Sequence, residues 1–349
     1  MRGDIRVGII GAGRTSASHV KALRRLPNIT VAGVFDADGR RAAALAGRFQ
    51  IPRHADDPEA FYALVEPQVV HVLTPPDTHE ALVLAALDKG AHVLVEKPPS
   101  LTAAGCSLIE RQADAARLTV GLNENFAADP RVVAARRKIA GGALGRLVHI
   151  DVFFGFDGRA LKDDLSDWPW VRVLPGGILE DLLPHPLTVA RALSGGDLVP
   201  KHWEVFRSGR LAFALPDELR LMLANEEGAT AHVKLSLSAH PPSFSIRVFG
   251  TEGTLQIDLR NMLVNLDRIG PGASVAARGL SLSGRAFEIL AQTASNALAT
   301  GLFRAPRPGD PIHLLGAHYQ ALRTGGELPA PIGRAKRTLE IARQIWPYS

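Results

Sequence analysis

One stretch near the start of the chain indicates the fold: Arg6-Val7-Gly8-Ile9-Ile10-Gly11-Ala12-Gly13-Arg14-Thr15-Ser16. An apolar run leads here directly into a glycine-rich turn. Glycines at positions 11 and 13 permit a tight turn and close approach of a pyrophosphate, whose charge the amides at the start of a following helix would stabilise. Ser16 replaces the third glycine of the usual pattern and adds a hydroxyl that could donate a hydrogen bond. The turn alone is weak evidence, because glycine-rich turns also arise for conformational reasons.

A carboxylate further along the chain strengthens this interpretation. Asp36 ends the second predicted strand, 23 positions after Gly13. A carboxylate there accepts hydrogen bonds from the adenosine ribose and repels a 2'-phosphate. Turn and acid together predict a dinucleotide cofactor, NAD in preference to NADP. The alternative is that Asp36 only caps the strand end, and Arg40 and Arg41 could offset part of the repulsion.

From residue 5 to about 122, short β-rich runs alternate with helical stretches of ten or more residues. This rhythm is typical of repeated βαβ units, and the near-continuous apolar character of the runs fits strands covered by helices on both faces. We therefore expect an α/β doubly wound parallel sheet, a Rossmann domain that binds NAD, over residues 1–122. Its strands are predicted at 6–10, 30–35, 69–73, 92–95 and 118–122.

Residues 123–349 follow a different pattern, in which strands appear without helices between them. Along 147–154 one face carries Val148, Ile150, Val152 and Phe154 and the other carries His149 and Asp151, as in a sheet with one wet face. Hairpins are predicted at 218–224 with 229–238 and at 245–249 with 254–259, and helices at 285–302, 313–324 and 333–346. We expect an α+β domain with a large, mostly antiparallel open sheet for substrate binding and oligomerisation, whose C-terminal helices could pack back on the first domain.

Composition limits the function. Of the 349 residues 46% are hydrophobic and 21% charged, so the chain can bury two cores and is not disordered. The 40 lysines and arginines exceed the 35 acidic residues by only five, too few to predict a nucleic-acid partner. The single cysteine, Cys106, excludes an intramolecular disulfide framework and suggests a buried residue in a reducing compartment. With no export signal and no membrane-spanning stretch in the sequence, we expect a cytoplasmic protein without a membrane partner.

Three further motifs resemble one family of oxidoreductases: Thr74-Pro75-Pro76-Asp77-Thr78-His79, Glu96-Lys97-Pro98 and Gly250-Thr251-Glu252-Gly253-Thr254. In this combination nearly the whole chain resembles the Gfo/Idh/MocA family, named after glucose-fructose oxidoreductase, inositol dehydrogenase and the rhizopine-catabolism protein. The resemblance implies an N-terminal nucleotide-binding domain, a C-terminal open-sheet domain that carries substrate, and pyridine-nucleotide redox chemistry on sugars or polyols.

Lys97 is the first candidate for catalysis. It follows a predicted parallel strand, at the end where open α/β sheets bind ligands, and Pro98 prevents the strand from simply continuing. An ammonium group there could hydrogen-bond a substrate oxygen and stabilise alkoxide charge during hydride transfer. The alternative is a solvated surface lysine. Glu96 could contact the nicotinamide side or pair with Lys97.

The second candidate cluster is the run Pro175-Gly-Gly-Ile-Leu-Glu-Asp-Leu-Leu-Pro-His-Pro186. It is similar to the family's Gly-Gly-x-x-x-Asp-x-x-x-His segment, which implies a substrate-binding aspartate at Asp181 and a proton-relaying histidine at His185. Residues four apart share one helical face, so Asp181 could orient the substrate or tune the imidazole while His185 acts as general base.

Two prolines in this cluster put the simple geometry in doubt. Pro184 and Pro186 favour a broken segment with a helix restarting near Pro186. In the alternative interpretation His185 caps that helix and Asp181 caps a turn. Glu180 is a rival carboxylate, although the spacing to the glycines and the histidine fits Asp181 better.

Further residues complete the expected site. For the cofactor they are Gly11, Gly13, Arg14, Thr15, Ser16, Asp36, Thr74, Pro75, His79, Glu96 and Lys97. For the substrate we expect Asn123, Asn125, Lys162, Trp168, Trp170 and Arg172, since tryptophan faces stack on a pyranose and a cation recognises an acidic group. Core packing explains the tryptophans about as well. The other histidines, among them His71, His149 and His232, show no metal-ligand spacing, so no metal is predicted.

These observations favour an NAD(P)-dependent oxidoreductase that moves a hydride between nicotinamide and a carbinol carbon of a sugar, inositol or related polyol. One alternative is glycoside cleavage that uses NAD transiently, and another is a nucleotide-sensing protein without catalysis. Covering the open sheet with a second copy would be economical, so we expect a homodimer or homotetramer.

Overall fold

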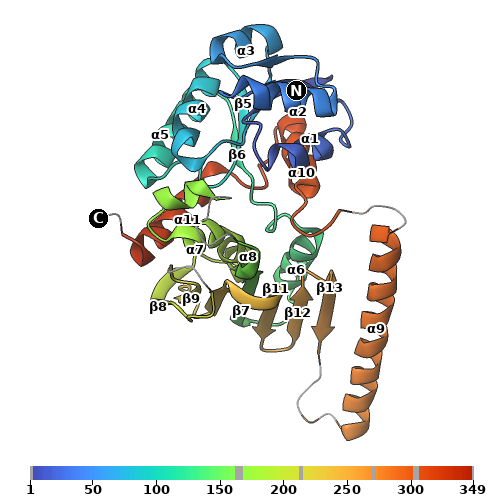
Figure 1. The fold of residues 1–349 in the computed structure, drawn as a ribbon. Coiled ribbons are helices and arrows are strands. Elements are labelled where there is room, and N and C mark those ends of the chain that lie inside the picture. The colour runs from blue at the N-terminus through green and yellow to red at the C-terminus, as the bar shows by residue number, and fades with distance from the viewer. Residues whose placement is uncertain are drawn as a thin grey trace. The chain divides into compact units, whose positions relative to one another are not determined.

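The computed structural model describes residues 3–161, 168–211, 215–268, 272, 274–301 and 306–347. The chain forms two compact units (Figure 1). The first comprises Met1–Asn125 and Asp310–Arg343, and the second comprises Phe126–Gly309 and Gln344–Ser349. A late segment of the sequence is therefore built into the first unit.

The first unit contains a six-stranded sheet in the order β3-β2-β1-β4-β5-β6, in which every pair is parallel. The order reverses between β1 and β4, which is the place where doubly wound sheets bind ligands beyond the carboxyl ends of the strands. The predicted Rossmann-type sheet is confirmed. Its strands are β1 (Ile5–Ile10), β2 (Ile29–Phe35), β3 (His54–Ala55), β4 (Val69–Val72), β5 (His92–Val95) and β6 (Val120–Leu122).

Helices cover this sheet, and side-chain caps fix where several of them begin. Asp38, Asp57 and Thr102 each accept a hydrogen bond from an amide in the first turn of α2, α3 and α5. On one face, α1, α2 and α10 supply apolar side chains to a single core with the fully buried residues Ile5 and Ile9 of β1. The helices are α1 (Ser16–Leu23), α2 (Gly39–Phe49), α3 (Pro58–Val65), α4 (Pro76–Asp88), α5 (Ala103–Ala116), α10 (Ile312–Thr324) and α11 (Ile332–Ile345).

The second unit contains a seven-stranded sheet in the order β13-β12-β11-β7-β10-β9-β8. Only β7 and β10 pair in parallel, so the predicted mostly antiparallel sheet is confirmed. The edge strands β8 and β13 are additions to the predicted set. The strands are β7 (Leu147–Asp157), β8 (Val199–Phe206), β9 (Glu218–Ala224), β10 (Thr230–Ser236), β11 (Ser238–Gly250), β12 (Thr254–Asp258) and β13 (Leu263–Asp267).

Two helices cover one face of this sheet, α6 (Pro130–Ala140) and α8 (Pro184–Ser194). Ile150, Val152 and Phe154 of β7 are buried on that face, as the alternation predicts. Val148 is an exception, because it is 46% exposed near the start of the strand. The remaining elements here are the short helices η1 (Gly158–Ala160), η2 (Pro169–Val173) and α7 (Gly177–Leu182).

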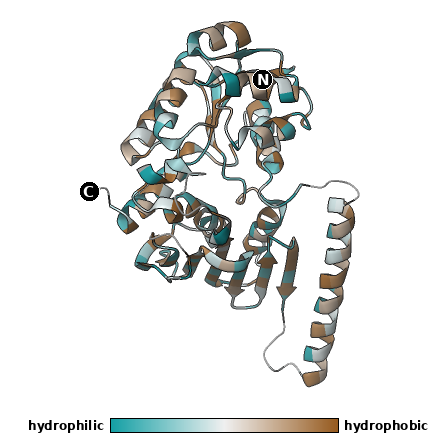
Figure 2. Ribbon diagram, in the orientation of Figure 1, coloured by the Kyte–Doolittle hydropathy of each residue, from teal (hydrophilic) through white to brown (hydrophobic). Residues whose placement is uncertain are grey.

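A long helix, α9 (Val275–Gly301), runs beside the edge strand β13 (Figure 1). It begins ten residues before the predicted start at residue 285. Figure 2 shows hydrophobic residues along much of its length. None of the helices in the described part of the chain is long and apolar enough to cross a bilayer.

Candidate active site

The glycine turn after β1 has the geometry of a phosphate cradle. Gly11 has φ of +96°, and a Cβ there would lie 2.9 Å from the backbone carbon of Leu73, so only glycine fits. Gly13 and Arg14 are exposed at the start of α1. The Ser16 hydroxyl donates to the carbonyl of Gly13 at 2.6 Å, so in this structure it closes the turn. The residues present therefore fit the diphosphate of a dinucleotide.

Asp36 lies directly after β2, as predicted, and it is tied to the same turn. One carboxylate oxygen accepts from the amide of Ala12 at 2.7 Å, and the other accepts from the amide of Asp38 at 2.9 Å. Arg40 and Arg41, which could have favoured a 2'-phosphate, both lie close to the carboxylate of Asp38. The carboxylate of Asp36 thus sits at the turn with its position fixed by two amides.

Glu96 and Lys97 directly follow β5, next to the turn that follows β4. Asn123 donates from Nδ2 to one carboxylate oxygen of Glu96 at 2.7 Å, and His19 Nε2 lies 3.8 Å from the same oxygen. Burial alone would raise the pKa of Glu96, but the hydrogen bonds and charges of His19, Lys97 and Asn123 outweigh it and lower the pKa to about 2. Glu96 is therefore a fixed negative charge beside Lys97.

Sequence reasoning missed the polar network behind Glu96. His19 Nδ1 lies 2.9 Å from His71 Nδ1, and His71 Nε2 lies 2.8 Å from the hydroxyl of Tyr319. All three side chains are buried, and burial, with His19 and His318 nearby, lowers the pKa of His71 well below its usual value. The only signal for this network in the sequence is a histidine, His71, in an otherwise apolar strand.

His79, expected to bind the cofactor, joins two loops. Nδ1 lies 2.6 Å from the carbonyl of Pro98 and Nε2 lies 2.7 Å from the carbonyl of Thr74. Both ring nitrogens are thereby engaged with the backbone, and the side chain is buried. The histidine fixes the turn after β4 against the turn that carries Lys97, so it positions both.

The Asp181–His185 segment is broken at Leu183, and the helix restarts at Pro184, two residues before Pro186, as the prolines predict. α7 ends at Leu182 and α8 begins at Pro184, yet Leu183 keeps helical angles of φ −52° and ψ −39°. Asp181 is buried and His185 half-buried. The rival Glu180 accepts from the amide of Gly176 at 2.8 Å, so it is used to close the glycine turn.

Aromatic side chains surround His185. Its ring centre lies 5.1 Å from that of Phe126 and 5.9 Å from that of Phe154. Both phenylalanines also line a cavity of about 470 Å³ in the second unit. The other lining residues are Gly155, Phe156, Pro242, Ser243, Phe244, Leu259, Arg260, Asn261, Met262, Thr300, Arg307 and Pro308. A cavity lined by four phenylalanines and by several polar side chains suits a small organic substrate.

The expected substrate residues come from both units. Asn123 belongs to the network at Glu96, and Asn125 ends the first segment of the first unit. Trp168 is buried and stacks on Trp170 with ring centres 5.8 Å apart, which favours the packing interpretation for Trp168. Arg172 is exposed, and Lys162 lies outside the described residues.

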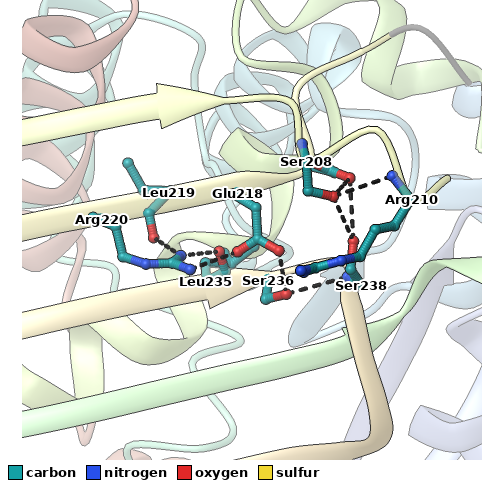
Figure 3. A network of polar contacts seen from close by, with 9 residues as sticks. Ser208, Arg210, Glu218, Leu219, Arg220, Leu235, Ser236 and Ser238 are labelled. Atoms are coloured by element: carbon teal, nitrogen blue, oxygen red, sulfur yellow. Dashed lines mark hydrogen bonds and ion pairs between the residues drawn. The ribbon is translucent and has the colours of Figure 1, made fainter.

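Two other polar clusters occur in the second unit. The buried carboxylates of Asp217 and Glu218 are satisfied by serines and by Arg220, which makes them structural. Figure 3 shows Glu218 with Arg220 and Ser236. On the open face of the sheet, ligand atoms of His149, Asp151 and His232 lie within 4.8 Å of one another, contrary to the expectation from their spacing. Strand register brings them together, because His232 pairs with Asp151. The ammonium of Lys234 lies 2.7 Å from Asp151 and already neutralises that carboxylate.

Two family models match the chain. One describes an oxidoreductase family with an NAD-binding Rossmann fold and matches residues 5–124, and the other describes the GFO/IDH/MocA C-terminal domain and matches residues 132–256. The chain belongs to the Gfo/Idh/MocA oxidoreductase family. This confirms what the sequence motifs indicated: the chain is an oxidoreductase with an N-terminal NAD-binding domain.

Individual relatives agree with this assignment. Inositol 2-dehydrogenase 1 of Saccharopolyspora erythraea is 28% identical over 347 residues, which cover 91% of this chain and 98% of the relative. D-apiose dehydrogenase of Paraburkholderia graminis is 28% identical over 274 residues, 77% of this chain and 72% of the relative. The solved structure of an oxidoreductase from Agrobacterium radiobacter in complex with NAD+, L-tartaric acid and magnesium has the same fold. Its TM-score is 0.76 at 20% identity, over 97% of this chain and 94% of that one.

Proposed function

We propose that this chain is an NAD-dependent dehydrogenase acting on a carbinol carbon of a sugar, an inositol or a related polyol. The observation that carries the proposal is the strand order of the first unit. Because β1, β4 and β5 are neighbours, the glycine turn, the Thr74 turn and Lys97 follow consecutive carboxyl ends of one parallel sheet. Such an arrangement brings an ammonium group beside a dinucleotide turn. The names of the inositol and apiose dehydrogenases support the substrate class.

Oxidation of an alcohol removes a hydride from carbon and a proton from oxygen. Bound NAD supplies the hydride acceptor. Lys97 donates a hydrogen bond to the oxygen and stabilises the charge that develops on it. His185 takes the hydroxyl proton, and Asp181 orients the substrate or the imidazole.

The cofactor would be held by the first domain, residues 1–122. Gly11, Gly13, Arg14, Thr15 and Ser16 form the turn that receives the diphosphate, and Asp36 receives the ribose. Thr74, Pro75, His79, Glu96 and Lys97 would complete the cofactor site, and His79 also keeps the two loops in place. We propose NAD in preference to NADP, because the carboxylate of Asp36 is fixed at the turn and the nearby arginines lie beside Asp38.

The substrate would be held by the second domain, residues 123–349. Phe126 and Phe154 present an apolar wall beside His185, and Asn123, Asn125, Trp170, Arg172 and Lys162 remain proposed polar or stacking contacts. We also propose that the chain forms a homo-oligomer. Because its only cysteine is free and buried, we propose that it acts in the reducing cytoplasm.

The test is cofactor reduction with a panel of sugars and polyols, comparing the wild-type protein with Lys97→Ala and His185→Ala. We expect both variants to lose at least 100-fold in kcat, roughly the contribution of one acid–base or electrostatic group. Lys89→Ala and His202→Ala are matched controls, because Lys89 forms a surface pair with Glu59 and His202 is an exposed residue of β8. Unchanged turnover in Lys97→Ala and His185→Ala would remove the assignment.

The same panel separates the two alternatives. Release of free sugar from a glycoside with no net consumption of cofactor would indicate hydrolysis. Tight binding of NAD without hydride exchange toward any polyol would indicate a sensing protein.

A further inference from the structure

Two arginines line the cavity of the second unit without an acidic partner. Arg260 lies in the turn between β12 and β13, and Arg307 lies between α9 and α10. In the part of the chain that the structure describes, neither guanidinium forms a hydrogen bond or an ion pair. The described residues that line the cavity include no aspartate and no glutamate. The lining therefore has two positive charges that no described protein group neutralises.

The acidic residues nearest to these arginines in the sequence are used elsewhere. Asp258 accepts from the backbone amide of Asn261 at 3.0 Å and from its side-chain amide at 2.7 Å. Asp310 accepts from the backbone amide of Ile312 at 2.9 Å, at the start of α10. One carboxylate thus fixes a turn and the other the start of a helix, so acids lie close in the sequence to both arginines without pairing with them.

The turn that carries Arg260 is held in one conformation. Asn296 of α9 donates from its side-chain amide to the carbonyl of Asn261 at 3.3 Å and to that of Met262 at 2.8 Å. Together with the bonds of Asp258, these contacts fix the backbone of the turn. Arg260 itself is exposed. A fixed backbone leaves only the side chain to be ordered when a ligand binds, which lowers the cost of binding.

The rest of the lining strengthens the attraction for an anion. Four phenylalanines replace water over part of the cavity wall, and opposite charges attract more strongly where less water screens them. A guanidinium donates paired N–H groups that match the oxygens of a carboxylate or a phosphate. The volume of about 470 Å³ lies within the range of about 300 to 1,000 Å³ that is usual for small-molecule sites. The cavity therefore suits a small ligand that carries a negative charge.

We propose that the substrate of this site is a sugar or polyol that carries an anionic group, a carboxylate or a phosphate ester, and that Arg260 and Arg307 bind this group. The inference rests on the proposed function, because Phe126 and Phe154 line the cavity and also pack against His185. The anionic group takes no part in hydride transfer, so its contacts are as strong in the ground state as in the transition state. The two arginines should therefore lower KM and have little effect on kcat.

The first test is cofactor reduction with matched neutral and anionic compounds: D-glucose with D-glucuronate and with glucose 6-phosphate, and D-glucitol with D-gluconate. In at least one pair we expect kcat/KM to be roughly 10-fold or more higher for the anionic compound. This advantage should shrink as the salt concentration rises from about 50 to about 500 mM, because salt screens exposed charges. A higher value for the phosphate ester would identify phosphate as the anionic group. If no anionic compound is favoured over its neutral counterpart, the proposal is wrong.

The second test removes each charge. Arg260→Gln and Arg307→Gln should each lower the ratio of kcat/KM for the anionic compound to that for its neutral counterpart roughly 10- to 100-fold, the usual effect of losing a charge-assisted contact. Most of the loss should lie in KM for the anionic compound. Arg136→Gln is the matched control, because Arg136 is an exposed residue of α6 and does not line the cavity. A ratio that neither cavity variant lowers would overturn the proposal.

Binding measured without turnover separates this inference from the proposed function. Isothermal titration calorimetry with D-glucuronate and D-gluconate, in the presence of NAD, compares the wild-type protein with the double variant Arg260→Gln, Arg307→Gln. If the double variant loses binding and no compound of the panel reduces NAD, the dehydrogenase assignment fails and the anion site stands. If neutral sugars are oxidised with no preference for the acids, the anion site fails and the dehydrogenase assignment stands.

Discussion

The surroundings of Lys97 and of His185 differ in kind. Beside Lys97, Glu96 is held by Asn123 and lies near His19, in a network of buried polar groups that extends to Tyr319. Beside His185 lie phenylalanine rings and a cavity. Buried polar groups each need a partner, so such a network permits one arrangement, whereas apolar walls can change shape at little cost. The polar surroundings of Lys97 therefore tolerate fewer substitutions than the aromatic surroundings of His185.

Of the changes considered, loss of the His185 imidazole should have the largest effect on the rate. In His185→Ala we expect kcat to fall roughly 10²- to 10⁴-fold, the usual contribution of a general base, with a smaller change in KM. Added imidazole should restore part of the rate, because the phenylalanine walls leave a space of the right size. Steady-state kinetics with and without imidazole checks this. A variant that loses rate but is never rescued, at any imidazole concentration, would favour a structural role for His185.

A change in the polar network around Glu96 should lower the stability of the protein as well as the rate. Glu96→Ala removes the acceptor of the Asn123 amide, and a buried donor without a partner costs about 1–3 kcal/mol. We expect the free energy of unfolding in urea to fall by that amount. Phe126→Leu should change KM for the substrate more than stability, and Glu66→Ala, which alters an exposed residue, is the control. Equal stability of the Glu96→Ala and wild-type proteins would show that the polar network around Glu96 does not stabilise the fold.

The free energy of unfolding of the first unit should depend on pH, because this unit buries neutral histidines. Burial, with a contribution from His92, lowers the pKa of His318 to about 3, so the folded state keeps this side chain neutral where the unfolded chain binds a proton. Unfolding free energy should therefore fall as the pH drops below about 6.5, by about 1.4 kcal/mol per pH unit for one such group. His71 acts in the same direction. His318→Leu should flatten the slope measured by urea unfolding, and His54→Gln, at an exposed position, should not.

The sequence predicts the central strands of this molecule better than its edges. β1, β4 and β5 are almost fully buried and their sequences are near-continuous apolar runs. β8 is almost fully exposed and carries Lys201 and Glu204, so neither pattern marks it as a strand. The start of α9 was missed because Gly279 and Gly284 have low helix propensity. In the structure the helix nevertheless continues through both glycines.

The same difference applies to the candidate site, where turns at strand ends could be predicted and contacts between distant elements could not. Turns that follow predicted strands, such as those at Gly11 and Lys97, could be located because strand order alone determines where they lie. The network could not, since its partners come from separate elements: His19 meets His71 across 52 residues, and His71 meets Tyr319 across 248. The cluster of His149, Asp151 and His232 was missed for the same reason, because it depends on the register of two strands.

The smallest expected effect is on cofactor preference, which Asp36 after β2 should influence directly. Asp36→Asn keeps an oxygen that can accept from the amide of Ala12 but removes the charge that would repel a 2'-phosphate. We expect kcat/KM for NADP relative to NAD to rise about fivefold, a change of roughly 1 kcal/mol. Asp56→Asn alters the net charge equally at an exposed position nearby and should leave the ratio unchanged. If both variants shift the ratio alike, the preference comes from the general field of the surface, and the fixed carboxylate after β2 has no special part in it.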